Sequence, residues 1–157
     1  MKGGEFMKAL VVYDSNYGNT QMIANAIAKQ LGTKAVNVAD FSKEDLKEIE
    51  LLVVGSPINA WGPTAKIKKF LNNLTDGDLD EVKVAAFDTR VKLFIHGDAA
   101  KKISKGLKKA GGKVIARPQG FIVEGTEGPL GQGEADKAID WAKAIKDSSA
   151  SGYTRMM

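Results

Sequence analysis

Short apolar runs alternate with longer amphipathic stretches along most of the chain. The apolar runs are rich in β-branched residues and have the length of strands, at about 8–13, 35–38, 51–55, 83–87, 113–116 and 120–123. Between them, apolar residues recur with helical spacing over about 20–31, 63–74, 99–110 and 134–146. Strands that alternate with helices predict βαβ units, and hence a parallel sheet with helices on both faces.

Local signals indicate where several of these elements end. Gly32 follows the first predicted helix, in the position where a glycine commonly ends a helix. Ser42 and Asp45 have the spacing of a capping box and predict a brief helix over 42–49. Pro118 interrupts the last apolar region, so the fifth strand is expected to be broken or bent there.

The length of 157 residues favours a single domain, which we expect over residues 7–146. Residues 1–6, MKGGEF, precede a second methionine, Met7, and resemble a leader added for expression. Residues 147–157 are polar and aperiodic, and we expect them to form a disordered tail.

Composition excludes several kinds of chemistry. The chain has no cysteine and one histidine, which excludes disulfides, thiolate catalysis, cysteine-ligated iron–sulfur clusters and a histidine-rich metal site. No apolar run reaches the roughly 18 residues of a membrane span, and no secretory signal follows the start. We therefore expect a cytoplasmic protein. The net charge of +4 permits an acidic partner but does not by itself indicate nucleic-acid binding.

A small polar loop joins the first strand to the first helix. It brings the hydroxyls of Ser15 and Thr20 to the start of that helix. The first turn of a helix has unpaired N–H groups and the positive end of the helix dipole. The loop is therefore suited to a dianionic phosphate. The alternative is an ordinary strand-to-helix turn with a capped helix.

Other phosphate-binding architectures fit this sequence less well. A Walker loop needs a lysine after its last glycine, and none stands beside Gly18. A dinucleotide fingerprint needs three glycines in this turn, so Asp40, which ends the next strand, is interpreted as a turn residue. A receiver domain would have an acid where Gly55 and Ser56 stand, and a phosphatase of similar architecture would need a cysteine.

Ser15, Gly18 and Thr20 match the pattern Thr/Ser-x-x-Gly-x-Thr that follows the first strand of flavodoxins, so the chain resembles that family. The resemblance implies a three-layer α/β/α sandwich, with a five-stranded parallel sheet in the order 2-1-3-4-5 and FMN at the carboxyl edge. It places the FMN phosphate in the first loop, at Ser15, Asn16, Tyr17, Gly18, Asn19 and Thr20.

The resemblance also places the flavin ring beside the loops after the third and fourth strands. These loops contain Ser56, Pro57, Ile58, Asn59, Ala60, Trp61 and Gly62, and then Asp88, Thr89 and Arg90. Trp61 is expected to stack on the ring, the alternative being a surface or packing tryptophan. Arg90 would contact the pyrimidine carbonyl or the phosphate, or remain a solvated charge. Phe94 or His96 could cover the other ring face.

In flavodoxins a backbone carbonyl of the loop after the third strand turns toward the flavin on reduction. Asn59 and Gly62 belong to the residue types that best tolerate unusual backbone angles. Because Pro63 restrains Gly62, the peptide Asn59–Ala60 is predicted to move.

With no thiol, metal cluster or catalytic triad, hard redox chemistry would belong to the cofactor, and we predict neither a catalytic residue nor a metal ligand. We expect a one-electron carrier between redox partner proteins. One alternative is an FMN-dependent NAD(P)H or quinone oxidoreductase of the same fold. It is less favoured because the chain has no long insertion for a nicotinamide. Another is a flavin-free scaffold or regulatory module.

Overall fold

The computed structural model describes residues 7–92 and 97–155. The predicted leader at 1–6, residues 156–157 of the predicted tail, and the candidates Phe94 and His96 lie outside the described residues.

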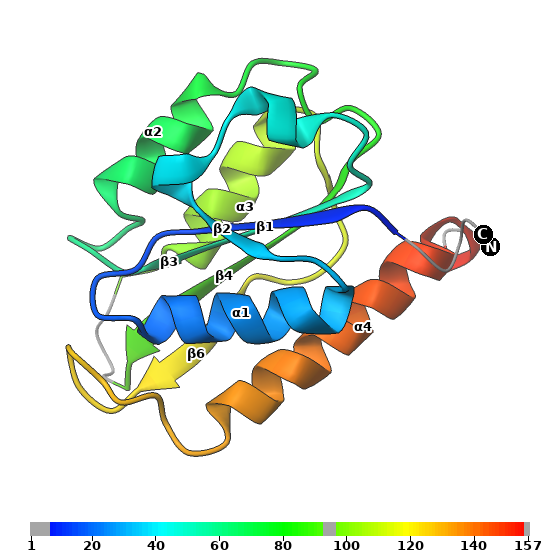
Figure 1. Ribbon diagram of the computed structural model, residues 1–157. Helices are drawn as coiled ribbons and strands as arrows, with labels where there is room; N and C mark the ends of the chain where they lie inside the picture. Colours follow the sequence, from blue (N-terminus) through cyan, green and yellow to red (C-terminus); the bar gives the residue numbers. More distant parts are fainter. Residues whose placement is uncertain (1–6, 93–96, 156–157) are drawn as a thin grey trace.

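The fold is a twisted parallel sheet between two layers of helices (Figure 1). The strands are β1 (Ala9–Tyr13), β2 (Ala35–Asn37), β3 (Leu51–Pro57), β4 (Lys83–Val91), β5 (Lys113–Val114) and β6 (Gln119–Val123). All pairs are parallel in the order β2-β1-β3-β4-β5, and β6 also pairs with β4. The predicted order is thus confirmed, with the fifth strand divided into β5 and β6 around Pro118.

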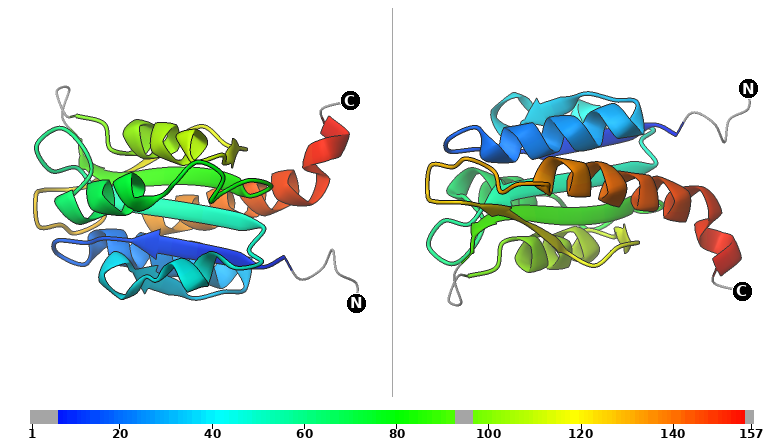
Figure 2. Two further views of the ribbon diagram at one scale, coloured as in Figure 1. Left: turned by 90° about the horizontal axis from the view of Figure 1, so that it is seen from above. Right: turned by 90° about the horizontal axis from the view of Figure 1, so that it is seen from below.

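Four α-helices cover the sheet in the described part of the chain: α1 (Asn19–Leu31), α2 (Ala65–Asn73), α3 (Ala100–Lys109) and α4 (Glu134–Arg155). Figure 2 shows α2 and α3 over one face and α1 and α4 over the other. Gly32 ends α1 in a left-handed conformation, as predicted. The capping box of Ser42 and Asp45 is present, but it opens a single 3₁₀ turn, Lys43–Leu46.

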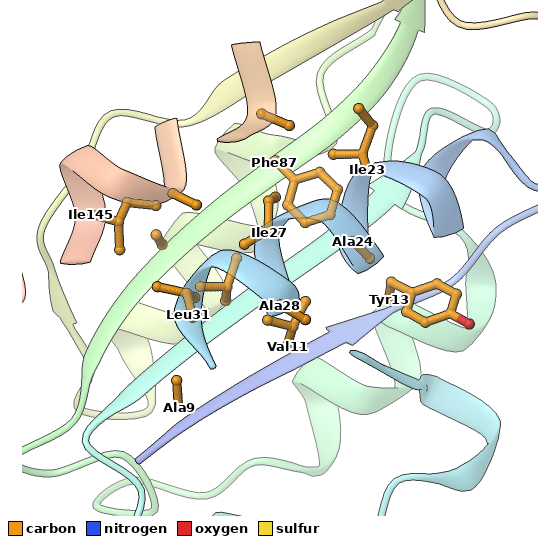
Figure 3. Close-up of a cluster of buried hydrophobic side chains, with 14 of the residues drawn as sticks. Ala9, Val11, Tyr13, Ile23, Ala24, Ile27, Ala28, Leu31, Phe87 and Ile145 are labelled. Atoms are coloured by element: carbon orange, nitrogen blue, oxygen red, sulfur yellow. The ribbon is translucent and has the colours of Figure 1, made fainter. Parts of the chain in front are cut away.

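Each face of the sheet buries its own hydrophobic cluster. Figure 3 shows the cluster under α1 and α4, where Ile23 and Ile27 of α1 lie near Phe87 of β4, with Ile145 of α4 in the same cluster. The cluster on the opposite face contains Leu52, Val54, Ile67, Phe70, Ile103 and Leu107. Continuous apolar strands such as Leu51–Val54 are buried on both sides, as the sequence pattern predicted.

The third and fourth strands are longer than predicted. Ser56 and Pro57 belong to β3, and they pair in register with Asp88 and Thr89 of β4. The predicted loop at Asp88–Arg90 is therefore wrong, because β4 continues to Val91 between β3 and β6. Strand pairing on both sides satisfies the backbone there, although the side chains are polar.

The last helix is also longer than predicted. It continues through residues 147–155, which contradicts the expected disorder of that part of the tail. Ser149 is 4% exposed, and its carbonyl accepts a hydrogen bond from Lys83 Nζ at 2.8 Å. The extension thus contacts the rest of the domain at Ser149.

Residues 7–92 and 97–155 contain neither a candidate membrane span nor a candidate metal site. No described helix has both the length and the hydropathy required to cross a membrane. In the same part of the chain, no group of three or more His, Cys, Asp or Glu side chains could hold a metal ion.

Candidate functional site

The first loop presents a group of backbone donors at the start of α1. Gly18 has a φ of 95°, which turns the chain into the helix, and its N–H donates to Ser15 Oγ at 2.9 Å. Ser15 Nα–H itself donates to Asp14 Oδ1. The remaining N–H groups of this segment have no hydrogen-bond partner among the described residues; they belong to Asn16, Tyr17, Asn19, Thr20 and Gln21. A cluster of such N–H donors at the start of a helix is suited to bind a phosphate.

Two threonine hydroxyls, one from α1 and one from β4, form a hydrogen bond with each other. Thr20 Oγ1 and Thr89 Oγ1 lie 2.8 Å apart, and the two residues are almost fully buried. A single hydrogen bond between two hydroxyls uses one of their two hydrogens, so the other hydrogen can still be donated. Ser15 Oγ accepts from Gly18 N–H and closes the loop, and its own hydroxyl hydrogen has no acceptor among the described residues, so it can also be donated.

The second loop is a tight hairpin turn at Asn59–Gly62. Asn59 N–H donates to the Gly62 carbonyl at 2.7 Å, and Gly62 N–H donates back to the Asn59 carbonyl at 3.0 Å. Ala60 and Trp61 have φ values of 48° and 73°, the left-handed conformations of a type I′ turn. The unusual backbone angles therefore lie at Ala60 and Trp61, and not at the predicted Asn59 and Gly62. A positive φ strains the backbone of a residue that is not glycine.

Some backbone polar groups of this turn form hydrogen bonds, and others do not. The Trp61 carbonyl accepts hydrogen bonds from Asp98 N–H at 3.0 Å and from Lys102 Nζ at 3.3 Å. The Ala60 carbonyl and the Trp61 N–H have no hydrogen bond to any described residue. Because the Asn59 carbonyl is bonded, the peptide best able to turn is Ala60–Trp61, one residue beyond the predicted one.

Two contacts join the second loop to its neighbours. Asn16 Nδ2 donates to Asn59 Oδ1 at 2.8 Å, which links the first and second loops. Gly97 lies directly against the Trp61 backbone, where a Cβ would overlap it. The indole of Trp61 is nevertheless 59% exposed, and Tyr17 nearby in the first loop is 55% exposed. Two large aromatic side chains are therefore available at this edge.

The partly buried Arg90 and the buried Asp88 form an ion pair on β4. Arg90 Nε and Nη2 donate to the two oxygens of Asp88 at 2.8 and 2.7 Å. Asp88 is fully buried and also accepts from the N–H groups of Ala99 and Ala100 at the start of α3. The hydrogen bonds that Arg90 donates to Asp88 raise the pKa of Arg90 above its ordinary value. Arg90 is thus an anchored cation, which contradicts the alternative of a solvated charge.

These elements enclose a cavity of about 340 Å³ at the carboxyl edge of the sheet. This volume is within the roughly 300–1,000 Å³ of small-molecule sites. Eleven of the predicted site residues line it: Asn16, Tyr17, Asn19, Thr20, Pro57, Ile58, Asn59, Ala60, Trp61, Thr89 and Arg90. The other five are not among its lining residues: Ser15, Gly18, Ser56, Gly62 and Asp88.

Ser56 supports the second loop from its buried position in β3. Its hydroxyl donates to the Pro57 carbonyl at 2.7 Å and accepts from Thr64 N–H at 3.0 Å. Ser56 is fully buried, so it fixes the two ends of the second loop and does not face the cavity.

Four lining residues were not predicted: Val91, Gly97, Val123 and Thr126. Val91 was not predicted because β4 extends beyond its predicted end. Val123 ends the last strand, β6, and Thr126 follows it at the same carboxyl edge, so the parallel topology alone could have indicated them. Asn19 Nδ2 also donates to the Glu127 carbonyl at 3.1 Å, which holds this last loop against the first.

A family model described as flavodoxin matches residues 11–146. A flavodoxin of Haemophilus influenzae is 34% identical over 79 residues, which cover 48% of this chain and 45% of that protein. A flavodoxin of Aquifex aeolicus is 32% identical over 91 residues, which cover 52% and 49%. The matched regions thus span about half the length of these curated relatives.

Solved structures agree with the fold. An archaeal flavodoxin superposes with a TM-score of 0.74 at 22% identity, covering 91% of this chain and 99% of that one. Oxidised flavodoxin 2 from Bacillus cereus gives a TM-score of 0.77 at 21% identity, with coverage of 90% and 99%. Because the family model spans most of the sequence, the chain belongs to the flavodoxin family.

Proposed function

We propose that this chain binds FMN at the cavity of the first, second and last loops and carries single electrons between redox partner proteins. Membership of the flavodoxin family implies a flavin cofactor. The observation that carries the choice of FMN is the group of N–H donors beside the cavity that have no partner among the described residues, those of Asn16, Tyr17, Asn19, Thr20 and Gln21. Riboflavin has no phosphate for such donors, whereas FMN does.

The residues present fit a phosphate that is bound mainly by neutral donors. The loop from Ser15 to Thr20 contains no lysine or arginine, so backbone N–H groups and the α1 dipole supply the positive potential. The Thr20–Thr89 pair adds one hydroxyl hydrogen at the same place. Binding by a fixed backbone would orient the cofactor without the conformational cost of ordering long side chains.

The second loop would hold the flat part of the cofactor. Trp61 and Tyr17 are exposed aromatic residues at the rim, and an aromatic pair contributes roughly 0.5–1.5 kcal/mol beyond its buried area. The Asp88–Arg90 pair fixes the floor and the start of α3. FMN supplies the redox chemistry when bound, and the chain binds it, limits its contact with water and exposes one edge to partners.

Thr20→Ala tests the phosphate assignment. A hydrogen bond to a charged group contributes roughly 1.5–3 kcal/mol, so FMN affinity should fall by about ten- to a hundredfold. Riboflavin affinity should change much less, because it has no phosphate. The measurement is fluorescence titration of both ligands against the flavin-free chain. Thr20→Ser, which keeps the hydroxyl, and Thr33→Ala, far from the cavity, are the controls. Equal weakening of FMN and riboflavin would contradict the assignment.

A further inference from the structure

The outer surfaces of α2 and α3 are exclusively basic. These two helices carry no aspartate or glutamate, and their eight exposed lysines are Lys66, Lys68, Lys69, Lys101, Lys102, Lys105, Lys108 and Lys109. We call this surface the α2–α3 face. None of these ammonium groups forms an ion pair with a carboxylate of the described residues. These eight ammonium groups are therefore available for a partner with negative charge.

The eight lysines lie on one side of the sheet. Figure 2 shows α2 and α3 together on one face of the sheet, whereas α1 and α4 lie on the other. On α4, acidic residues alternate with lysines, for example Asp140 with Lys143 and Lys146. Since the whole chain has a net charge of +4, the eight lysines exceed the total, and the rest of the chain is net negative. The charged residues of α2 and α3 are thus all positive, whereas the charges of the remaining chain sum to a negative value.

The α2–α3 face reaches the rim of the cavity. Lys102 Nζ donates to the Trp61 carbonyl at 3.3 Å. A Cβ placed on Gly62 would lie 3.3 Å from Lys102 Nζ and 3.8 Å from Lys68 Cε, so lysines of both helices converge on the same turn. Like charges that converge beside an exposed tryptophan raise the free energy of the isolated protein, and an opposite charge brought to that place would lower it.

We propose that the α2–α3 face is the docking surface for an acidic redox protein, which exchanges electrons at the Trp61 edge. The proposal rests on the proposed electron-carrier function. A surface lined by one sign of charge attracts and orients a complementary partner, and it raises the association rate more than the final affinity. Tyr17 and Trp61 lie where the face meets the cavity, and both residue types are enriched at the cores of protein interfaces.

A protein partner suits this face better than a nucleic acid. The face has no arginine, the residue that most often contacts bases and phosphates in a bidentate geometry, and its lysines lie on convex helix surfaces without interleaved aromatic residues. Proximity to the cavity also matters, because it brings an acidic partner's redox centre close to the cofactor.

The test compares two charge-reversed variants of the FMN-loaded chain. The face variant is Lys68→Glu/Lys101→Glu/Lys105→Glu, and the matched control is Lys29→Glu/Lys143→Glu/Lys146→Glu on α1 and α4. All six lysines are exposed, so the two variants change the net charge equally and differ only in position. The probes are an acidic ferredoxin, a basic cytochrome c and a double-stranded DNA oligonucleotide. Affinity, electron-transfer rate and FMN affinity are measured at about 0.02 M and 0.3 M salt.

We expect the wild-type chain to bind the ferredoxin at low salt and to lose roughly tenfold in affinity at high salt. The face variant should lose about tenfold at low salt, whereas the control variant should lose less than about threefold. FMN affinity should stay within about twofold in both variants, because none of the six lysines lines the cavity.

Three results would overturn the docking proposal: equal losses in both variants, no binding of the ferredoxin, or tighter salt-dependent binding of the DNA than of the ferredoxin. Failure of the wild-type chain to bind FMN would instead refute the proposed function. The ferredoxin affinity of the flavin-free chain would then still report on the α2–α3 face, so the two failures are distinguishable.

Discussion

Trp61 and Trp141 occupy opposite environments. Trp61 is exposed at the cavity, whereas Trp141 packs edge-on against Phe87 and Phe121 with ring centroids 6.1 and 5.9 Å apart. If Trp61 stacks on the flavin, FMN should quench its fluorescence. Trp61→Phe should remove most of that change, and Trp141→Phe should leave it in place. The measurement is tryptophan emission during FMN titration; the opposite pattern in the two variants would show that the second loop does not contact the ring.

Ala60 offers a second test at the residue scale. Its φ of 48° strains a side chain but not a glycine. Ala60→Gly should therefore raise the free energy of unfolding by about 0.5–1 kcal/mol, measured by urea denaturation. Ala26→Gly, in the middle of α1, should lower the same quantity by about 1 kcal/mol. A loss of stability in Ala60→Gly would mean that the turn is not strained at this position.

The positions of site residues were predictable from the sequence, but their hydrogen-bond partners were not. The residue types and spacing of Ser15, Gly18 and Thr20 were sufficient to locate the first loop. They could not show that Ser15 Oγ accepts from Gly18 while Thr20 Oγ1 pairs with Thr89, 69 positions away. Side-chain direction depends on long-range partners, and these exist only once the strands are paired. The same limit explains Arg90, whose partner Asp88 is nearby but whose burial depends on β6.

At the scale of elements, strand and helix boundaries were the least predictable features. Period and composition located every strand, but β4 extends over the polar residues Asp88–Arg90 because β3 and β6 pair with it on both sides. Polar residues favour loops only when nothing else satisfies the backbone and the side chain. Here Asp88 and Arg90 satisfy each other. The divided fifth strand was predictable, because Pro118 is a local signal.

The end of α4 gives a prediction at this scale. Truncation after Lys146 removes Ser149, whose carbonyl accepts from Lys83 and whose hydroxyl lies 2.8 Å from Met7 Sδ. We expect the free energy of unfolding to fall by about 1–3 kcal/mol, since the partly buried Lys83 and Met7 lose their contacts with Ser149. Truncation after Ser149 keeps both contacts and is the matched control. If the two truncations have the same stability, residues 147–149 contribute nothing to the fold.

On the scale of the whole molecule, the alternation of strands and helices was enough to predict the layers and the strand order. Right-handed crossovers place helices on both faces, and parallel strands bring their carboxyl ends to one edge. The basic α2–α3 face was harder to predict. Lysines between apolar positions look like ordinary solvated faces when each helix is considered alone. Only the fold places α2 and α3 side by side and brings their lysines to Gly62.

The last prediction separates a carrier from an enzyme of the same fold. A one-electron carrier must give and take electrons singly, so its two flavin reduction steps must be well separated in potential. The peptide Ala60–Trp61 has free polar groups in a strained turn beside the cavity, and it can therefore present a different group to the cofactor in each redox state. Anaerobic titration of the FMN-loaded chain with dithionite should show two resolved steps, whereas free FMN measured in parallel should not. Reduction by NADPH alone should be slow in stopped-flow mixing. Rapid multiple turnover with NADPH and a quinone, together with unresolved reduction steps, would instead favour the oxidoreductase.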